Sequence, residues 1–283
     1  MSFFRRFFDF LLFGNIFVAI GAVSLIQSTV IQLGIINFNY TYSLLVFFAT
    51  LFIYNLQRIF YKKVEDRSMN SIRRKWIFTH QTTIKILTLI GFMGVGITFF
   101  FNDYKIMFYL SPLLLLSLAY FIPRIKLRKS AGFKLFTLAT VWVLTTAMVP
   151  LLLAHAPVDF KFILHLSTRF CFMLAICIPF DIRDVGIDAA ENVNTLPLQL
   201  GEKQTRNLAL VFTLVYVFLL AIEYLKQIIT FPHLFALLIA AAATFLLVLF
   251  SSSKRSEYYY VAGIDGTMIL QGVLLAFVSF LPQ

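Results

Sequence analysis

The sequence predicts an all-α fold: a polytopic membrane protein built as a bundle of nine transmembrane helices. Of its 283 residues, 60% are hydrophobic and only 13% are charged, and the mean hydropathy is +0.87. Soluble domains carry about 25% charged residues, so the composition excludes an ordinary soluble protein. The apolar residues also gather into runs that are long enough to cross a bilayer as helices.

Nine such runs can be counted along the chain. They lie near residues 10–33, 41–61, 84–101, 105–123, 133–154, 160–180, 207–225, 231–251 and 258–281. The first run follows two arginines, as a signal peptide would, but it is longer than the apolar part of such peptides and lacks a clear cleavage site. We therefore interpret it as a retained span. No soluble domain fits between the runs, so residues 1–283 are expected to form one transmembrane domain.

The basic residues between the runs predict an orientation. Twenty of the 24 Lys and Arg residues lie in the N-terminus and in every second connecting segment, three lie in the other segments, and Arg169 lies inside a run. Because cytoplasmic loops are enriched in Lys and Arg, we expect the N-terminus in the cytoplasm and the C-terminus outside. We expect the membrane to be a bacterial inner membrane. The net charge of +11 follows from this topology, and no nucleic-acid partner is expected.

The segment PFDIRDVGID after the sixth run carries the densest acidic pattern. Pro179 is expected to end or kink the helix. Spacings of three and four residues place Asp181, Asp184 and Asp188 on one helix face, whereas Arg183 is expected to point elsewhere. Three like charges at a membrane boundary repel one another, so a cation is expected among them. The candidate is Mg²⁺ bound with a phosphate-bearing substrate. The alternative is a solvated acidic loop end.

Two further segments place polar and basic residues at helix ends on the same predicted side. One ends the second run and the other ends the fourth run. Their candidate phosphate-binding residues are Asn55, Arg58, Tyr120, Arg124, Lys126 and Arg128. Guanidinium and ammonium groups near a metal-binding acidic segment suit a diphosphate. Tyrosines and basic residues are also ordinary interfacial anchors, and that alternative stays open.

Two charged residues fall inside predicted spans. Arg169 lies in the sixth span and Asp265 in the ninth, and ionisable groups inside a membrane are costly and often functional. The two could pair, although a rise of 1.5 Å per residue puts them at somewhat different depths. A charged pathway of this kind would suit a transporter, but no inverted repeat is evident.

On these motifs, the chain resembles the UbiA superfamily of intramembrane prenyltransferases over nearly its whole length. DIRDVGID and the following TLPLQLG are similar to the family's second aspartate motif, and YFIPRIK resembles its YSxP-type basic motif. The resemblance implies a UbiA-like bundle in which two Mg²⁺ ions, held by both aspartate motifs, bind the diphosphate of a prenyl donor. In this chain we expect one Mg²⁺ on Asp184 and Asp188, with Asp181 in support. The prenyl group would then pass to an aromatic or other lipophilic acceptor, with membrane lipids around the protein.

The chain departs from this family in its first motif, which is usually Asn-Asp-x-x-Asp-x-x-x-Asp. Aligned on Asn55, the expected aspartates are replaced by Leu56, Ile59 and Lys63. One metal site is therefore expected to be missing, with Arg58 or Lys62 contacting the phosphate directly. Because a fixed cation is a poorer Lewis acid than a metal, the alternative is a catalytically impaired relative. Such a protein would bind isoprenoid or lipid phosphate headgroups without turnover.

Overall fold

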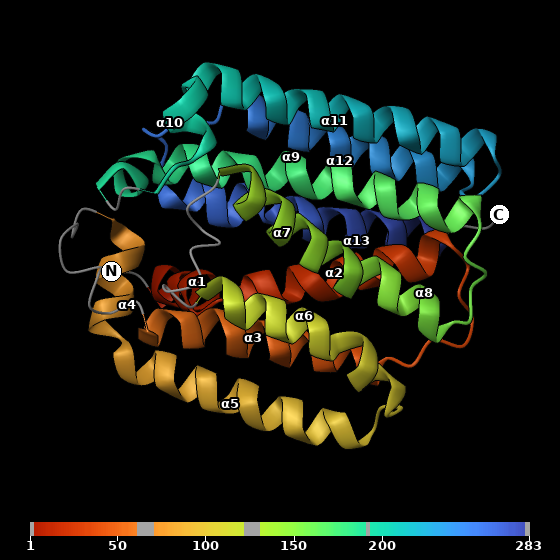
Figure 1. Cartoon of the computed structure of the whole chain (residues 1–283), viewed down its shortest axis with the longest axis horizontal. Helices are drawn as coiled ribbons and strands as arrows, with labels where there is room; N and C mark the ends of the chain where they lie inside the picture. The colour runs from red at the N-terminus through yellow and green to blue at the C-terminus, as the bar shows by residue number, and fades with distance from the viewer. Residues whose placement is uncertain (1–2, 61–70, 122–130, 191–192, 281–283) are drawn as a thin grey trace.

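The computed structural model describes residues 3–60, 71–121, 131–190 and 193–280, and every regular element in these ranges is helical (Figure 1). The helices are α1 (Phe3–Phe13), α2 (Ile16–Gln32), α3 (Thr41–Phe60), α4 (Ile72–Thr79), α5 (Gln81–Phe100), α6 (Lys105–Phe121), α7 (Ala131–Val143), α8 (Val149–Leu153), α9 (Phe160–Ala190), α10 (Leu196–Leu200), α11 (Glu202–Leu225), α12 (Phe231–Leu249) and α13 (Gly266–Ser279). Two π-helical stretches, Leu144–Met148 and Tyr259–Ile264, join α7 to α8 and precede α13.

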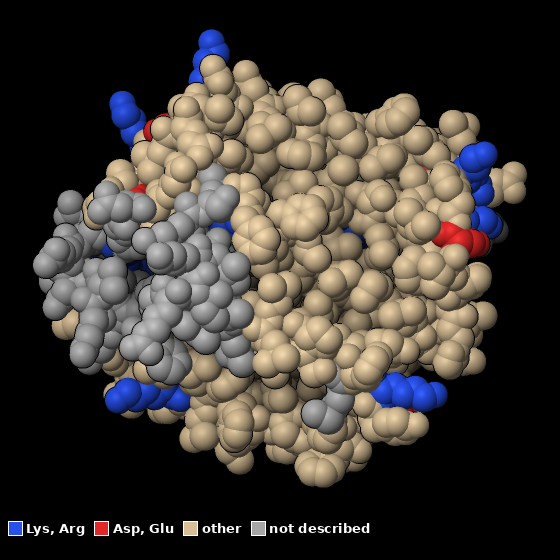
Figure 2. All heavy atoms as spheres, viewed as in Figure 1, with Lys and Arg blue, Asp and Glu red and all other residues tan. Residues whose placement is uncertain are grey.

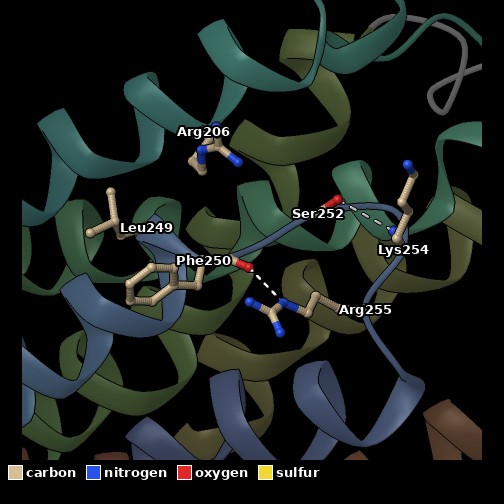
Figure 3. A pocket seen from close by; sticks show the side chains of 6 residues that line it. All are labelled: Arg206, Leu249, Phe250, Ser252, Lys254 and Arg255. Atoms are coloured by element: carbon tan, nitrogen blue, oxygen red, sulfur yellow. Dashed lines mark hydrogen bonds between the residues drawn. The ribbon is translucent and has the colours of Figure 1, made fainter.

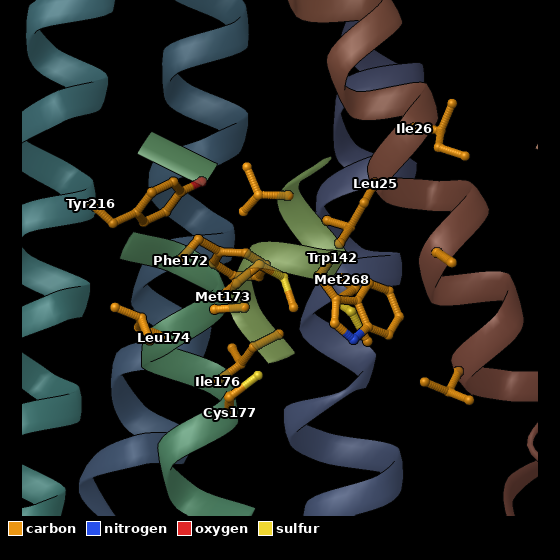
Figure 4. Close-up of a cluster of buried hydrophobic side chains, with 14 of the residues drawn as sticks. Leu25, Ile26, Trp142, Phe172, Met173, Leu174, Ile176, Cys177, Tyr216 and Met268 are labelled. Carbon is orange, nitrogen blue, oxygen red and sulfur yellow. The ribbon is translucent and has the colours of Figure 1, made fainter. Parts of the chain in front are cut away.

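The long helices lie side by side along the long axis of the molecule, and α9 is the most buried of the spanning helices (Figure 1). It packs against α7, α11 and α12, while α2 packs against α3 and α13. Apolar side chains from these helices meet in one core, in which Phe172 of α9, Leu25 of α2 and Trp142 of α7 are buried (Figure 4). The buried side chains of α9, Asp181 and Asp188 among them, are therefore surrounded by protein and not by lipid.

The outer surface is suited to a membrane. On the face shown in Figure 2, charged atoms gather towards the two ends of the molecule, and the middle is almost entirely uncharged. Large apolar side chains such as Leu89, Phe92 and Ile97 are exposed along α5. Such a belt is costly in water and favourable against lipid tails. These observations describe a multi-pass integral membrane protein.

The number of spans is less definite than the sequence predicts. Seven helices in the described ranges are long and apolar enough to cross a membrane, and the bent pair of α1 and α2 raises the number to eight. Helix α6 adds only a shorter apolar segment, Phe108–Ser117. A helix lies at each of the nine apolar runs, but the count of nine spans is not confirmed.

The first apolar run is broken, although the sequence predicts one span over residues 10–33. Helices α1 and α2 meet at 60°, and Asn15 between them adopts a left-handed conformation with φ 61°. Asn is one of the few residues that tolerate this region. The Asn15 side-chain amide donates a hydrogen bond to Asn55 Oδ1, and Asn55 Nδ2 donates to the Gly14 carbonyl. The polar groups freed at the bend are thus satisfied inside the bundle.

Helices α3 and α5 approach closely at glycines, as small residues allow in membrane bundles. A Cβ atom built on Gly91 would lie 2.7 Å from the Phe52 backbone nitrogen and 3.0 Å from the Phe48 carbonyl oxygen. These are backbone atoms, so they cannot rotate away. A Cβ on Gly96, also in α5, meets nothing within 4 Å.

Gly91→Ala is therefore expected to destabilise the protein by about 1–3 kcal/mol, the usual cost of overpacking. Gly96→Ala is the matched control and should be neutral or slightly stabilising, because Ala is the better helix former. Thermal unfolding of both variants in detergent measures the difference. Equal melting temperatures for the two variants would show that α3 and α5 do not approach each other closely at Gly91.

Candidate functional site

The acidic residues lie within a continuous helix. Pro179 does not end the sixth helix, because α9 runs through it to Ala190. Neighbouring helices in a membrane bundle commonly tolerate an interior proline by compensating the lost backbone bond. Asp181, Asp184 and Asp188 therefore have the helical spacing that the sequence predicts. They lie at what we call the charged end of the bundle, with residues 71–74 and 252–257.

Asp181 and Asp188 share one lysine. Lys134 Nζ of α7 donates a hydrogen bond to Asp181 Oδ1 at 2.6 Å and lies 3.6 Å from Asp188 Oδ2. All three residues are buried. The cation that the sequence predicts among the carboxylates is, in this structure, a lysine ammonium. Lys134 was missed as a site residue because it resembles one more interfacial basic residue at the start of an apolar run.

Asp184 faces a different partner. Arg183 was expected to point elsewhere, but its Nε and Nη2 atoms donate two hydrogen bonds of 2.7 Å to the Asp184 carboxylate. This paired geometry is the strong form of an arginine–carboxylate contact. The three aspartates therefore divide into two groups: Asp181 and Asp188 at Lys134, and Asp184 at Arg183.

A second carboxylate joins this arginine. Glu257 Oε2 lies 3.7 Å from Arg183 Nη1 and 3.6 Å from Arg73 Nε of α4, while Ser71 Oγ donates a 2.6 Å hydrogen bond to Glu257 Oε1. Burial alone would raise the pKa of Glu257, but Arg73 and Arg183 lower it below its ordinary value. Burial, followed by the charges of Arg183 and Arg58, lowers the pKa of Arg73 to about 9. Arg58 therefore belongs to the same cluster of positive charge.

Asp265 also belongs to the charged end. Asp265 lies close enough to Arg183 and Arg73 for their charges to interact. The suggested pairing with Arg169 is wrong. Arg169 Nη1 donates a 3.0 Å hydrogen bond to Gln271, whose amide donates to Tyr216. Helices α9, α11 and α13 thus satisfy Arg169 internally, and it takes no part in the charged end.

The remaining predicted residues have different positions. Asn55 is fully buried, and its amide is occupied by Asn15, Gly14 and Leu51, so it holds the α1–α2 bend against α3. The backbone of Tyr120 lies in α6. The Tyr120 side chain and the three basic residues after it lie outside what the structure describes, and their roles remain predictions: Arg124, Lys126 and Arg128.

The carboxylates of Asp181 and Asp188 could supply some, but not all, of the ligands that Mg²⁺ needs. Among the described residues, no three His, Cys, Asp or Glu side chains form a cluster that could hold a metal by itself. Mg²⁺, however, usually binds one or two carboxylates together with substrate phosphates. Asp181 Oδ2 is buried and accepts no hydrogen bond from the described part of the chain. Asp181 and Asp188 therefore offer a two-carboxylate site that phosphate oxygens would complete.

A separate basic depression lies nearby on the surface. An open hollow of about 520 Å³ is lined by Arg206, Leu249, Phe250, Ser252, Lys254 and Arg255 (Figure 3). Arg255 Nε donates to the Phe250 carbonyl, and Arg206 Nη1 donates to the Ser251 carbonyl. These arginines are thus partly engaged by the loop itself. None of the lining residues is an acidic residue of α9, so the depression is distinct from the aspartate site.

Comparison with known proteins gives a clear result for the fold. The sequence matches no protein-family model and no curated protein. A UbiA homologue from Archaeoglobus fulgidus, bound to GPP and Mg²⁺, matches over 95% of this chain and 99% of its own at 12% identity and a TM-score of 0.64. The same homologue bound to DMAPP and Mg²⁺ matches at 14% identity and a TM-score of 0.64, over 96% of this chain and 100% of its own.

A digeranylgeranylglyceryl phosphate synthase structure matches at 15% identity and a TM-score of 0.56, covering 97% of this chain and 98% of its own. At these identities the likeness concerns the fold. The chain therefore has the helical architecture of UbiA-type proteins along nearly its whole length, as the sequence motifs predict.

Lys134→Met tests the shared lysine. Removing one partner of a buried ion pair typically costs about 3–5 kcal/mol, because the remaining charge is buried without compensation. We expect a large loss of thermal stability in detergent, and we expect millimolar Mg²⁺ to restore more stability in this variant than in the wild type. Lys85→Met, on an exposed position of α5, is the control. A variant as stable as the control, or one unaffected by Mg²⁺, would contradict the two-carboxylate site.

Proposed function

We propose that this protein is a membrane prenyltransferase that moves a prenyl group from a prenyl diphosphate to an aromatic or other lipophilic acceptor with the help of Mg²⁺. The observation that carries the proposal is the charged end of the bundle. Two buried carboxylates and a lysine lie on one side, and arginines from three helices lie on the other. This arrangement complements a metal–diphosphate pair, in an architecture shared with proteins that bind GPP or DMAPP with Mg²⁺.

Asp181 and Asp188 would hold the ion, and Asp184 would support the site through Arg183. When bound, Mg²⁺ would neutralise charge on the departing diphosphate. Lys134 would pass from the carboxylates to a phosphate oxygen once the metal is bound. Arg58 and Arg73 would contact the phosphates where the first aspartate motif is missing, with Arg124, Lys126 and Arg128 as further candidates. Preorganised positive charge of this kind stabilises a leaving anion without reorganisation.

The apolar interior suits the rest of the donor. A prenyl chain would extend from the charged end between the helices, and the acceptor would reach the allylic carbon from the lipid. The distribution of basic residues supports a cytoplasmic location for the charged end, with the N-terminus inside and residues 1–283 as a single domain. A donor that is synthesised in the cytoplasm would then enter directly.

The first test is Mg²⁺-dependent release of diphosphate from prenyl diphosphates of several lengths, with candidate acceptors. Asp181→Asn, Asp184→Asn and Asp188→Asn are each expected to lower the rate by roughly 100-fold, the usual scale for a lost electrostatic contact. Asp103→Asn is the control, because Asp103 is exposed and caps the backbone at Lys105. If the wild type binds the donor but releases no diphosphate with any acceptor, the non-catalytic alternative replaces this proposal. An Asp184→Asn rate equal to that of the wild type would remove Asp184 from the site.

The second test concerns the arginine that stands near the missing aspartates. Arg58→Ala is expected to weaken donor binding by roughly 10-fold or more, because a phosphate contact by a charged group is lost. Arg58→Lys should recover part of the affinity, since it keeps the charge but loses the paired geometry. Lys85→Ala controls for the simple loss of one positive charge. Unchanged donor affinity in Arg58→Ala would show that Arg58 is only an interfacial anchor.

A further inference from the structure

The contacts of Glu257 are unusual for a buried carboxylate. Its Oε2 atom is nearly equidistant from two guanidinium groups, 3.6 Å from Arg73 Nε and 3.7 Å from Arg183 Nη1. These distances are too long for hydrogen bonds. Among the described residues, Arg73 Nε, Arg183 Nη1 and Glu257 Oε2 accordingly have no hydrogen-bond partner, although all three atoms are buried. One oxygen thus balances two cations without bonding to either.

The other contacts in this cluster are normal. The Nε and Nη2 atoms of Arg183 each donate a hydrogen bond of 2.7 Å to the Asp184 carboxylate. Ser71, which precedes α4, donates a hydrogen bond of 2.6 Å from its Oγ atom to Glu257 Oε1. Two buried guanidinium nitrogens without hydrogen-bond partners, Arg73 Nε and Arg183 Nη1, therefore lie within 3.7 Å of the same oxygen, Glu257 Oε2. Buried N–H groups of charged residues are costly when unbonded, so their convergence indicates a place for an anion with more oxygen atoms.

A phosphate group meets this requirement. It carries three terminal acceptor oxygens and a higher charge than a carboxylate, and it commonly binds between arginine side chains. The cluster is built from three separate parts of the chain, α4, α9 and the segment before Tyr259–Ile264. It lies next to Asp184 and so beside the aspartate site. Burial is the largest cause of the lowered pKa of Arg73, and the nearby charges of Arg183 and Arg58 lower it further.

We propose that Arg73 and Arg183 bind one phosphate of the donor diphosphate, and that Glu257 occupies this place in the substrate-free protein as an internal competing anion. The inference rests on the proposed function for the identity of the ligand. On donor binding, Glu257 leaves Arg73 and Arg183, and phosphate oxygens take over the unsatisfied N–H groups. Glu257 thereby keeps the two arginines from repelling each other in the empty site, at the expense of donor affinity.

Inorganic pyrophosphate is the probe that isolates this step, because it has the anion without a prenyl chain. Titration calorimetry would compare the full-length wild type with Glu257→Gln and Glu202→Gln, with and without Mg²⁺. Glu257→Gln is expected to bind pyrophosphate roughly 10-fold more tightly, because a competing like charge is gone. Glu202→Gln is the matched control: Glu202 accepts from the Ser253 backbone nitrogen at the same end of the bundle and makes no contact with Arg73 or Arg183 in the described structure. It should bind like the wild type.

Equal or weaker binding by Glu257→Gln would overturn the proposal, since Glu257 would then only position the arginines. If Glu257→Gln fails to fold, a second pair of variants, Arg73→Gln and Arg206→Gln, tests the proposal. Arg73→Gln should weaken pyrophosphate binding roughly 10-fold, whereas Arg206→Gln, in the depression of Figure 3, should not. Equal binding by these two variants would overturn the proposal as well.

The same measurements separate this inference from the proposed function. Tighter pyrophosphate binding by Glu257→Gln without any prenyl transfer would leave an anion site in a protein with another activity. Prenyl transfer by a protein in which Glu257→Gln and Arg73→Gln bind pyrophosphate like the wild type would retain the function and reject Glu257 as a competitor.

Discussion

The charges on α9 must be compensated inside an apolar bundle, and the local structure of the charged end follows from this constraint. Ion pairs taken out of water lose several kcal/mol of solvation for each ion, so each must find a partner of opposite charge with good geometry. Lys134 meets that need for Asp181 and Asp188, and Arg183 meets it for Asp184. Lys134 comes from the neighbouring helix α7, whereas Arg183 lies on α9 itself and is linked through Glu257 to Arg73 of α4. The charges thereby join α7, α9 and α4 at one end of the molecule.

The resulting site is divided in two. The side with Asp181 and Asp188 suits a divalent cation, and the side with Arg73 and Arg183 suits an anion. In a family with two aspartate motifs, metals would serve both sides. Here the residues aligned with the first motif are apolar or basic, and arginines lie near that position. Direct arginine contact binds phosphate charge well but is a weaker Lewis acid than a metal. We therefore expect one metal ion, with guanidinium groups binding the phosphate charge that a second metal ion would otherwise bind.

The sequence predicts the fold and the acidic helix face because both depend on local periodicity. Long apolar runs indicate membrane helices, and spacings of three and four place the aspartates together. Their partners could not be predicted in this way. Lys134 is 47 residues from Asp181 along the chain and resembles an interfacial anchor. Arg73 and Glu257 lie in segments that show only ordinary loop charge, so only the tertiary structure, in which α4 packs on α1 and α5, brings them to Arg183.

The errors have similar physical reasons. Pro179 breaks helices in water, but the surrounding bundle allows α9 to continue. The bend at Asn15 is hidden by the apolar residues on either side, although a Gly-Asn pair is a turn signal that could have revealed it. Asn55 matches the first residue of a family motif, yet its amide is occupied by that bend. A motif residue is thus available to a ligand only if the fold leaves its polar atoms unused.

A crystal or cryo-electron microscopy structure with a non-hydrolysable prenyl thiodiphosphate and Mn²⁺ would test the central claim most directly, because anomalous scattering or strong density counts the metal ions. We expect one ion on Asp181 and Asp188, with Arg58, Arg73 and Arg183 on phosphate oxygens and Glu257 displaced. Two ions bridging the diphosphate, or a diphosphate bound away from these arginines, would contradict it.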